Sequence, residues 1–160
     1  MTDAVTHAEF TIERRYAHPR ARLYAAFADP EARRRWLIEG EGFTVESYVP
    51  GFGVGAVESS SFRYQDGPLM TNDTVWQDVQ PGTRAIFAYR MTLEGAPMSA
   101  SLVTVLFEDD GPGASRLVLT EQGAYIGAFA DVAGRERGMR DLLDALDAEL
   151  GGALTPVKDA

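Results

Sequence analysis

The C-terminal stretch 131–150, DVAGRERGMRDLLDALDAEL, constrains the fold more than any other part of the chain. Its apolar residues recur at the three- and four-residue spacing of a helix: Val132, Met139, Leu142, Leu143, Leu146 and Leu150. Acidic residues and arginines occupy the remaining surface. An amphipathic helix of about five turns needs a wide apolar surface to lie on. We therefore expect the preceding residues to form a sheet, and Asp131 to cap the helix.

Between residues 43 and 123 the hydrophobic pattern changes to a period of two, which is typical of half-buried strands. Turn signals separate the runs, and the strongest is Asp109-Asp110-Gly111-Pro112-Gly113. The expected strands are 43–48, 54–64, 70–80, 84–93, 99–108 and 115–123. Short turns between successive strands indicate an antiparallel meander.

The first 42 residues predict one more strand and two short helices. The strand is expected at 10–16 and the helices at 19–27 and 30–37. Asp29 is expected to cap the second helix, with Pro30 at its first helical position. The whole pattern predicts an α+β fold with a seven-stranded sheet and a long C-terminal helix.

Length, charge and composition narrow the class of protein. The 160 residues predict a single domain over 8–152, with 1–7 and 153–160 as tails. The chain holds 15 basic and 24 acidic residues, a net charge of −9, which disfavours nucleic acid as a partner. The absence of cysteine excludes disulfides, a thiol nucleophile and a thiolate metal site. No apolar run approaches the roughly 18 residues of a membrane span, and we expect a cytoplasmic protein.

Three stretches carry a resemblance to a known family: ERRYAHPRARLYAAF at 13–27, ADPEARRRW at 28–36 and LTEQGAYIGAFADVAGRERGMRDLLDALDAEL at 119–150. Together they resemble the START-like (SRPBCC) superfamily, and in particular its activator of heat-shock-protein-90 ATPase homologue-like branch. The resemblance implies a helix-grip fold, in which a curved antiparallel sheet wraps around the C-terminal helix. It also implies a cavity between the sheet and that helix.

The residues expected to line this cavity or its mouth are mostly apolar and aromatic, which suits an apolar ligand with a few polar groups. They are Arg14, Tyr16, Trp36, Phe43, Phe62, Tyr64, Phe87, Tyr89, Met91, Val103, Val105, Leu119, Glu121, Tyr125, Phe129, Arg135, Met139 and Leu143. The alternative is that the same aromatics simply fill a core. The pattern does not orient Trp76. The glycine-rich stretch 51–55 resembles the connection over the cavity mouth of START-like proteins, and a plain turn fits it equally well.

Glu121 is the charged residue of greatest interest, because strand alternation places it on the inner face with Leu117 and Leu119. A buried carboxylate needs a partner, and Arg135 is the first candidate and Arg14 the second. Three roles are open: an ion pair between sheet and helix, a group that orients a ligand, and a general acid or base as in the polyketide cyclases of the superfamily.

Tyrosines such as Tyr64 and Tyr89 are candidate proton-handling groups beside Glu121, and no other catalytic constellation is recognisable. The two histidines, His7 and His18, do not form a triad or a metal cluster, and we expect neither a metal nor a cofactor. We expect Arg33-Arg34-Arg35 to form a solvated helix face, with a partner-binding patch as the alternative.

The leading hypothesis is a non-enzymatic protein that binds a small apolar or amphipathic ligand. The first alternative is a cyclase- or hydrolase-like enzyme that uses Glu121. The second, a chaperone-interaction protein, follows from the family resemblance alone. A homodimer is also possible, because small START-like proteins can pair through sheet or helix faces.

Overall fold

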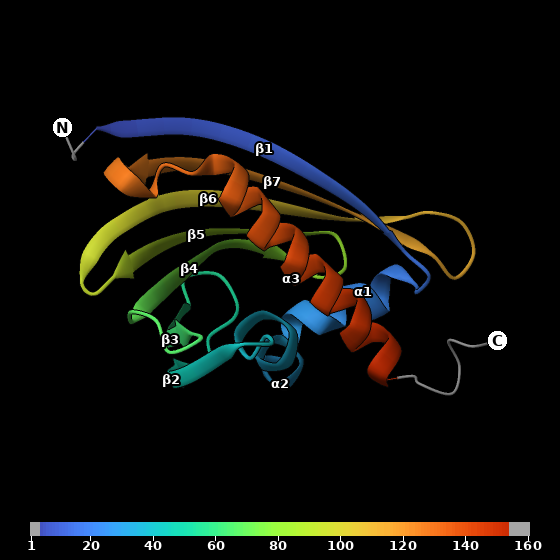
Figure 1. Cartoon of the computed structure of the whole chain (residues 1–160). Coiled ribbons are helices and arrows are strands. Elements are labelled where there is room, and N and C mark those ends of the chain that lie inside the picture. Colours follow the sequence, from blue (N-terminus) through green and yellow to red (C-terminus); the bar gives the residue numbers. More distant parts are fainter. Residues whose placement is uncertain (1–3, 154–160) are drawn as a thin grey trace.

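The computed structural model describes residues 4–153 and contains a curved seven-stranded sheet with a long helix lying diagonally across it (Figure 1). The strands are β1 (Val5–Tyr16), β2 (Phe43–Val49), β3 (Val57–Tyr64), β4 (Met70–Gln80), β5 (Arg84–Leu93), β6 (Ala96–Asp109) and β7 (Ser115–Ile126). The helices are α1 (Arg20–Ala28), α2 (Pro30–Arg33), a wide π turn η1 (Arg34–Ile38), a short turn η2 (Gly127–Phe129) and α3 (Val132–Ala153).

The sheet is antiparallel throughout, in the order β1-β7-β6-β5-β4-β3-β2. Strands β2 to β7 follow one another as a meander, and β1 returns to the far edge beside β7. The short helices lie between β1 and β2 and meet α3 near its C-terminal end (Figure 1). This confirms the predicted α+β class, the seven strands and the two short helices after the first strand.

Both predicted helix caps are present. The Asp29 Oδ1 accepts a hydrogen bond from the backbone N–H of Glu31 at 3.1 Å, and Pro30 occupies the first helical position. The Asp131 Oδ1 accepts from the backbone N–H of Gly134 at 2.9 Å. Each carboxylate satisfies an N–H group that has no partner within its own helix.

The ends of several elements differ from the prediction, and two of these differences reach the predicted tails. Strand β1 begins at Val5, because β7 continues to Ile126 and pairs with it, so residues 5–7 belong to the strand and not to a tail. Helix α3 continues through Gly151 to Ala153. The remaining predicted tail residues, 1–3 and 154–160, lie outside the described residues.

The two halves of α3 have different surroundings. In the C-terminal half, Leu143, Leu146 and Leu150 are fully buried in a core with Ile12 and Leu117. The N-terminal half, up to Leu143, faces a pocket instead. No helix within residues 4–153 is long and apolar enough to cross a membrane.

Candidate functional site

A pocket of about 540 Å³ lies between the N-terminal half of α3 and the inner face of β3, β4 and β5. One end is closed by residues of α1, α2 and η1, and the other by η2. The most exposed lining residues are Phe43, Ala128, Asp131 and Gly138. The pocket therefore meets solvent between β2 and the first turns of α3.

Most of the predicted lining residues surround this pocket. They are Trp36, Phe43, Phe62, Phe87, Tyr89, Met91, Leu119, Phe129, Arg135, Met139 and Leu143. Their role in binding a ligand stays a prediction. Trp76, which the sequence pattern did not orient, also points into the pocket and is 2% exposed.

Several predicted residues lie elsewhere. Val103 and Val105 are fully buried in the core, and Tyr125 lies behind the pocket wall. Tyr16 is buried, and its hydroxyl donates to the carbonyl oxygen of Leu143 at 3.0 Å. Tyr64 is 45% exposed. These positions have the expected strand alternation, but the pocket does not extend to them.

Arg14 is not a partner of Glu121, contrary to the second alternative. Its Nη1 donates to Asp144 Oδ1 at 2.7 Å, and its Nη2 donates to the Arg140 carbonyl at 3.2 Å. Glu121 pairs in the sheet register with Phe10, four residues before Arg14. Four residues of strand span about 13 Å, so the two side chains are too far apart to meet.

Glu121 is fully buried and accepts from four neighbours. The Tyr89 hydroxyl donates to Oε1 at 2.8 Å, and the hydroxyls of Ser101 and Tyr125 donate to Oε2 at 3.0 and 2.8 Å. The Nη1 of Arg135 lies 3.5 Å from Oε2. The predicted contact between Glu121 and Arg135 is confirmed, and three hydroxyl groups complete the carboxylate's hydrogen bonds.

Arg135 connects this buried cluster to the pocket. Its Nη1 donates to the Tyr89 hydroxyl at 2.9 Å and its Nη2 donates to the Ser99 hydroxyl at 2.9 Å. Burial, followed by the nearby Glu121 carboxylate, raises the pKa of Tyr89, and the same causes raise the pKa of Tyr125 to about 12. Both hydroxyls therefore stay protonated near neutral pH and remain hydrogen-bond donors to Glu121.

This geometry weighs against Glu121 as a general acid or base. The carboxylate does not line the pocket, and the side chains of Tyr89 and Arg135 separate Glu121 from it. A catalytic acid or base must come within hydrogen-bond reach of the proton that it transfers. Glu121 instead holds Tyr89 and Arg135 in place, and only these two groups reach the pocket.

A second buried ion pair lies at the other end of the pocket. It contains Arg33, which the sequence pattern predicted to be exposed to solvent. Arg33 is 1% exposed, and its Nε donates to both oxygens of Glu58 at 3.0 and 3.1 Å. Its Nη1 donates to the Phe27 carbonyl at 2.6 Å. The prediction of a solvated face is therefore wrong for Arg33, while Arg34 and Arg35 are more exposed and form surface ion pairs. Arg33 is buried because it precedes Trp36 by three residues and shares its inward-facing side of the helix.

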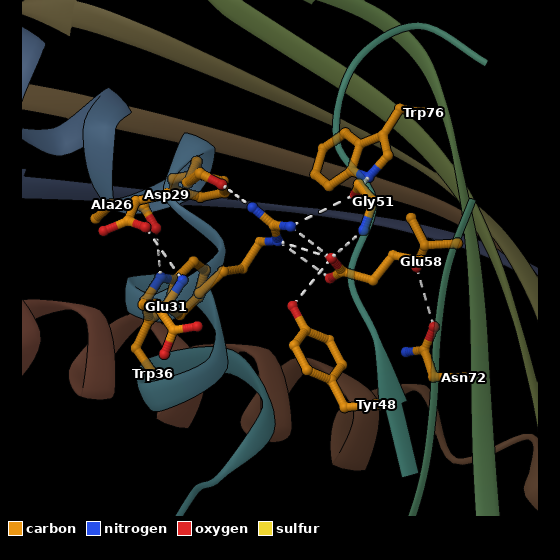
Figure 2. Close-up of polar contacts among 12 residues, drawn as sticks. Ala26, Asp29, Glu31, Trp36, Tyr48, Gly51, Glu58, Asn72 and Trp76 are labelled. Carbon is orange, nitrogen blue, oxygen red and sulfur yellow. Dashed lines mark hydrogen bonds and ion pairs between the residues drawn. The ribbon is translucent and has the colours of Figure 1, made fainter. Parts of the chain in front are cut away.

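The Glu58 carboxylate also holds the connection between β2 and β3 (Figure 2). Its Oε1 accepts from the Tyr48 hydroxyl at 3.0 Å and from the Gly51 backbone N–H at 3.1 Å. The Trp76 Nε1 donates to the Gly51 carbonyl at 2.7 Å. The glycine-rich stretch 51–55 is thus fixed against α2 and β4 beside the pocket.

Sequence reasoning missed the polar part of the lining. Arg33, Glu58, Ser60, Asn72 and Thr74 all line the pocket. A signal was available, because Glu58 and Ser60 alternate in phase with Phe62, and Asn72 and Thr74 alternate in phase with Met70. The prediction followed the apolar members of each face and left out the polar ones.

Within residues 4–153 no group of three or more histidine, aspartate and glutamate side chains is arranged to hold a metal ion. The lining residues offer hydrogen-bonding groups, aromatic rings and thioethers. Such a lining suits an organic molecule.

The family model of the Activator of Hsp90 ATPase homolog 1-like proteins matches residues 17–151. The chain belongs to this family. This confirms the branch of the START-like superfamily that the sequence motifs predicted. No curated protein matches the chain.

Solved structures agree with this assignment. A Rhizobium loti protein is 43% identical, with a TM-score of 0.84 over 91% of this chain and 99% of that one. A protein described as putative and uncharacterized from Rhizobium leguminosarum is 35% identical, with a TM-score of 0.88 over 94% and 98% of the two chains. A Chromobacterium violaceum protein at 23% identity and a TM-score of 0.73, over 89% and 96% of the chains, shares the fold.

Proposed function

We propose that this protein binds a small apolar or amphipathic molecule in the pocket between the sheet and α3, without transforming it. The observation that carries the proposal is the pocket itself. Its volume of about 540 Å³ lies within the range of small-molecule sites, which is roughly 300–1,000 Å³. Its wall is mostly apolar, with a few polar groups directed inward, and this is the usual make-up of such sites.

The lining methionines support this proposal. Met70, Met91, Met98 and Met139 come from three strands and α3, and all of them line the pocket. Methionine side chains are flexible and polarisable, and they adapt to irregular apolar surfaces. A pocket with four of them tolerates ligands of somewhat different shape.

The position of Glu121 supports a binding role over the enzymatic alternative that uses this carboxylate. A cyclase or hydrolase mechanism would use this carboxylate, but all of its near neighbours are donors from the protein and it does not reach the pocket.

The Hsp90 named in the family description suggests a different role, that of a chaperone-interaction protein. A pull-down with that chaperone tests this role.

Titration with the neutral fluorescent probe N-phenyl-1-naphthylamine tests the proposal. We expect the wild-type protein to enhance the probe's fluorescence with about one site per chain. Gly138 lines the pocket near its opening, and a Cβ built there meets no atom within 4 Å. The Gly138→Trp variant should therefore fold normally and bind the probe at least about tenfold more weakly, because the indole occupies the opening.

The matched control is Gly138→Ala, which adds a side chain too small to obstruct the pocket. This variant should bind the probe as the wild type does. The proposal is wrong if the wild-type protein does not bind the probe, or if Gly138→Trp binds it with unchanged affinity.

A further inference from the structure

The pocket contains a polar strip on the inner face of β3 and β4. Ser60 of β3 and Asn72 of β4 are direct partners in the strand register, and both line the pocket. Ser60 is 6% exposed. Polar groups in an enclosed wall are costly unless they form hydrogen bonds. Their position in an otherwise apolar lining therefore points to a partner inside the pocket.

These side chains have hydrogen-bonding capacity that the protein does not use. The Thr74 hydroxyl donates to Asn72 Oδ1 at 3.1 Å, which leaves the amide N–H groups of Asn72 for another acceptor. Within residues 4–153, neither the Asn72 Nδ2 nor the Ser60 Oγ has a hydrogen-bond partner, and neither atom is sealed from the pocket. The strip therefore presents unused donors to any molecule in the pocket.

Arg135 adds a third donor from the facing wall. Its Nη1 and Nη2 bond to Tyr89 and Ser99, while its Nε–H has no acceptor among the described residues. Tyr89 is the register partner of Thr74, and Asn72 lies two residues away on the same face of β4. The Arg135 guanidinium thus lies over β5, β6 and β7, whereas Ser60 and Asn72 lie on β3 and β4.

The charges of the lining disfavour an anion at this position. Arg135 lies 3.5 Å from the Glu121 carboxylate, and Arg33 is fully paired with Glu58. Asp131 adds a negative charge at the opening. The formal charges of these five groups sum to −1, and the whole chain carries −9. A buried ligand carboxylate would have no net positive charge to compensate its loss of water.

We infer that the ligand carries a neutral hydrogen-bond acceptor, a ketone or amide carbonyl, whose two lone pairs accept from Asn72 and Ser60. Its apolar body lies against the methionines and aromatic rings of the lining. This inference rests on the proposed function, and it specifies the chemical class of the ligand. It also assigns Asn72 and Ser60 a direct role in selecting the ligand.

Displacement of N-phenyl-1-naphthylamine by matched competitors tests the inference. The competitors are a methyl ketone, a carboxylate and an alkane of the same eleven-carbon chain, at neutral pH. We expect the ketone to displace the probe at least about tenfold better than the alkane, because one hydrogen bond to a donor that is otherwise unpaired is worth about that factor. The carboxylate should bind more weakly than the ketone.

Two variants and one control assign the preference to the strip. Asn72→Leu and Ser60→Ala should each lower the ratio of ketone to alkane affinity towards one. Ser59→Ala, on the other face of β3 and outside the lining, should retain the preference of the wild type. The ratio is measured within each folded variant, so differences in stability do not affect it.

The outcomes separate the two claims. If the wild type binds the probe but prefers the alkane or the carboxylate, the inference is wrong and the proposed function stands. The inference is also wrong if both variants keep the ketone preference. If the wild type does not bind the probe, both claims are wrong.

Discussion

Arg33 and Glu58 form an almost fully enclosed ion pair, with side chains 1% and 6% exposed. Desolvation offsets most of the attraction within such a pair, so its presence adds little net stability. Removing one partner is different, because the other charge then stays buried without compensation. Arg33 also donates to the Phe27 carbonyl of α1, and Glu58 also accepts from the Gly51 N–H. Loss of the pair would therefore affect both the end of α1 and the connection between β2 and β3.

We predict that Arg33→Met lowers the free energy of unfolding by about 3–5 kcal/mol, because Glu58 is left buried without a cation. Urea denaturation measures the change. Arg34→Met is the matched control, since Arg34 forms a solvent-exposed pair with Glu39 on the same helical segment. This control should be close to neutral.

A double variant separates the unpaired charge from lost packing. Glu58→Gln keeps an acceptor for Tyr48 and Gly51 but removes the negative charge. We predict that Arg33→Met/Glu58→Gln is more stable than Arg33→Met alone. A double variant as unstable as the sum of the two single variants would show that the buried charge is not the cause.

The two buried ion pairs differed in how far the sequence could predict them. Strand alternation placed Glu121 on the inner face, and Arg135 precedes Met139 of the helical stripe by four residues, so their contact was predictable. Arg33 belongs to a run of three arginines, which is typical of a solvated face. Its burial depends on Glu58, 25 residues further along the chain, and local spacing carries no information about that partner.

Two of the four glycines in helix α3, Gly134 and Gly138, differ in their surroundings. A Cβ at Gly138 meets no atom within 4 Å, whereas a Cβ at Gly134 would overlap the carboxylate of Asp131, which caps the helix. We predict that Gly138→Ala raises the free energy of unfolding by up to about 1 kcal/mol, because alanine favours the helix. Gly134→Ala should not raise the free energy of unfolding, because displacement of the Asp131 cap costs about as much as the alanine contributes.

Thermal unfolding of the two variants checks this pair of predictions. The midpoint should rise for Gly138→Ala and stay level or fall for Gly134→Ala. An equal rise in both would mean that the Asp131 cap does not contribute to the stability of α3.

The strands show why element bounds were partly predictable. The bounds of β4 and β5 match the period-two runs 70–80 and 84–93, because clear turn residues flank both of them. Strand β3 begins at Val57, three residues later than expected. Gly53 and Gly55 adopt positive φ angles of 108° and 84°, and the Gly55 N–H bonds to the Trp76 carbonyl, so this segment turns before it enters the sheet.

Across the whole molecule, burial raises the pKa of five tyrosines above the ordinary value of 10.0: Tyr16, Tyr24, Tyr48, Tyr89 and Tyr125. Tyr48 and Tyr125 reach about 12. Because the folded-state pKa exceeds the unfolded one, the protonated hydroxyls stabilise the fold. Their contribution is complete below pH 10 and decreases above it, and the part from Tyr48 and Tyr125 is lost as the pH rises through about 12.

We therefore predict that stability decreases from about pH 10 upward and that the buried tyrosines ionise together with unfolding. Circular dichroism and tyrosinate absorbance, recorded on the same samples, test this. Tyr48→Phe should make the decrease less steep, since it removes one of the five tyrosines with a raised pKa. Ionisation of all six tyrosines near pH 10 in a still folded protein would contradict the prediction.

The architecture of the whole molecule could be predicted, but the extent of the pocket could not. The period-two runs, the turns and the long amphipathic stripe were sufficient for the sheet and its helix. Whether inward-facing aromatics fill a core or leave space depends on how side chains from several strands pack. Val103 and Val105 thus fill the core, while Phe87 and Met91 of the neighbouring strand line the pocket.

The most direct test of the central claim is amide chemical-shift mapping of the isotopically labelled protein titrated with N-phenyl-1-naphthylamine. We predict that the amide shifts move in 72–76 of β4 and in 135–143 of α3, which line the pocket. Residues 108–113, in the hairpin between β6 and β7, should not move, because they lie outside the lining. Shifts confined to that hairpin or to the outer face of the sheet, or no shifts at all, would contradict a ligand-binding pocket between the sheet and α3.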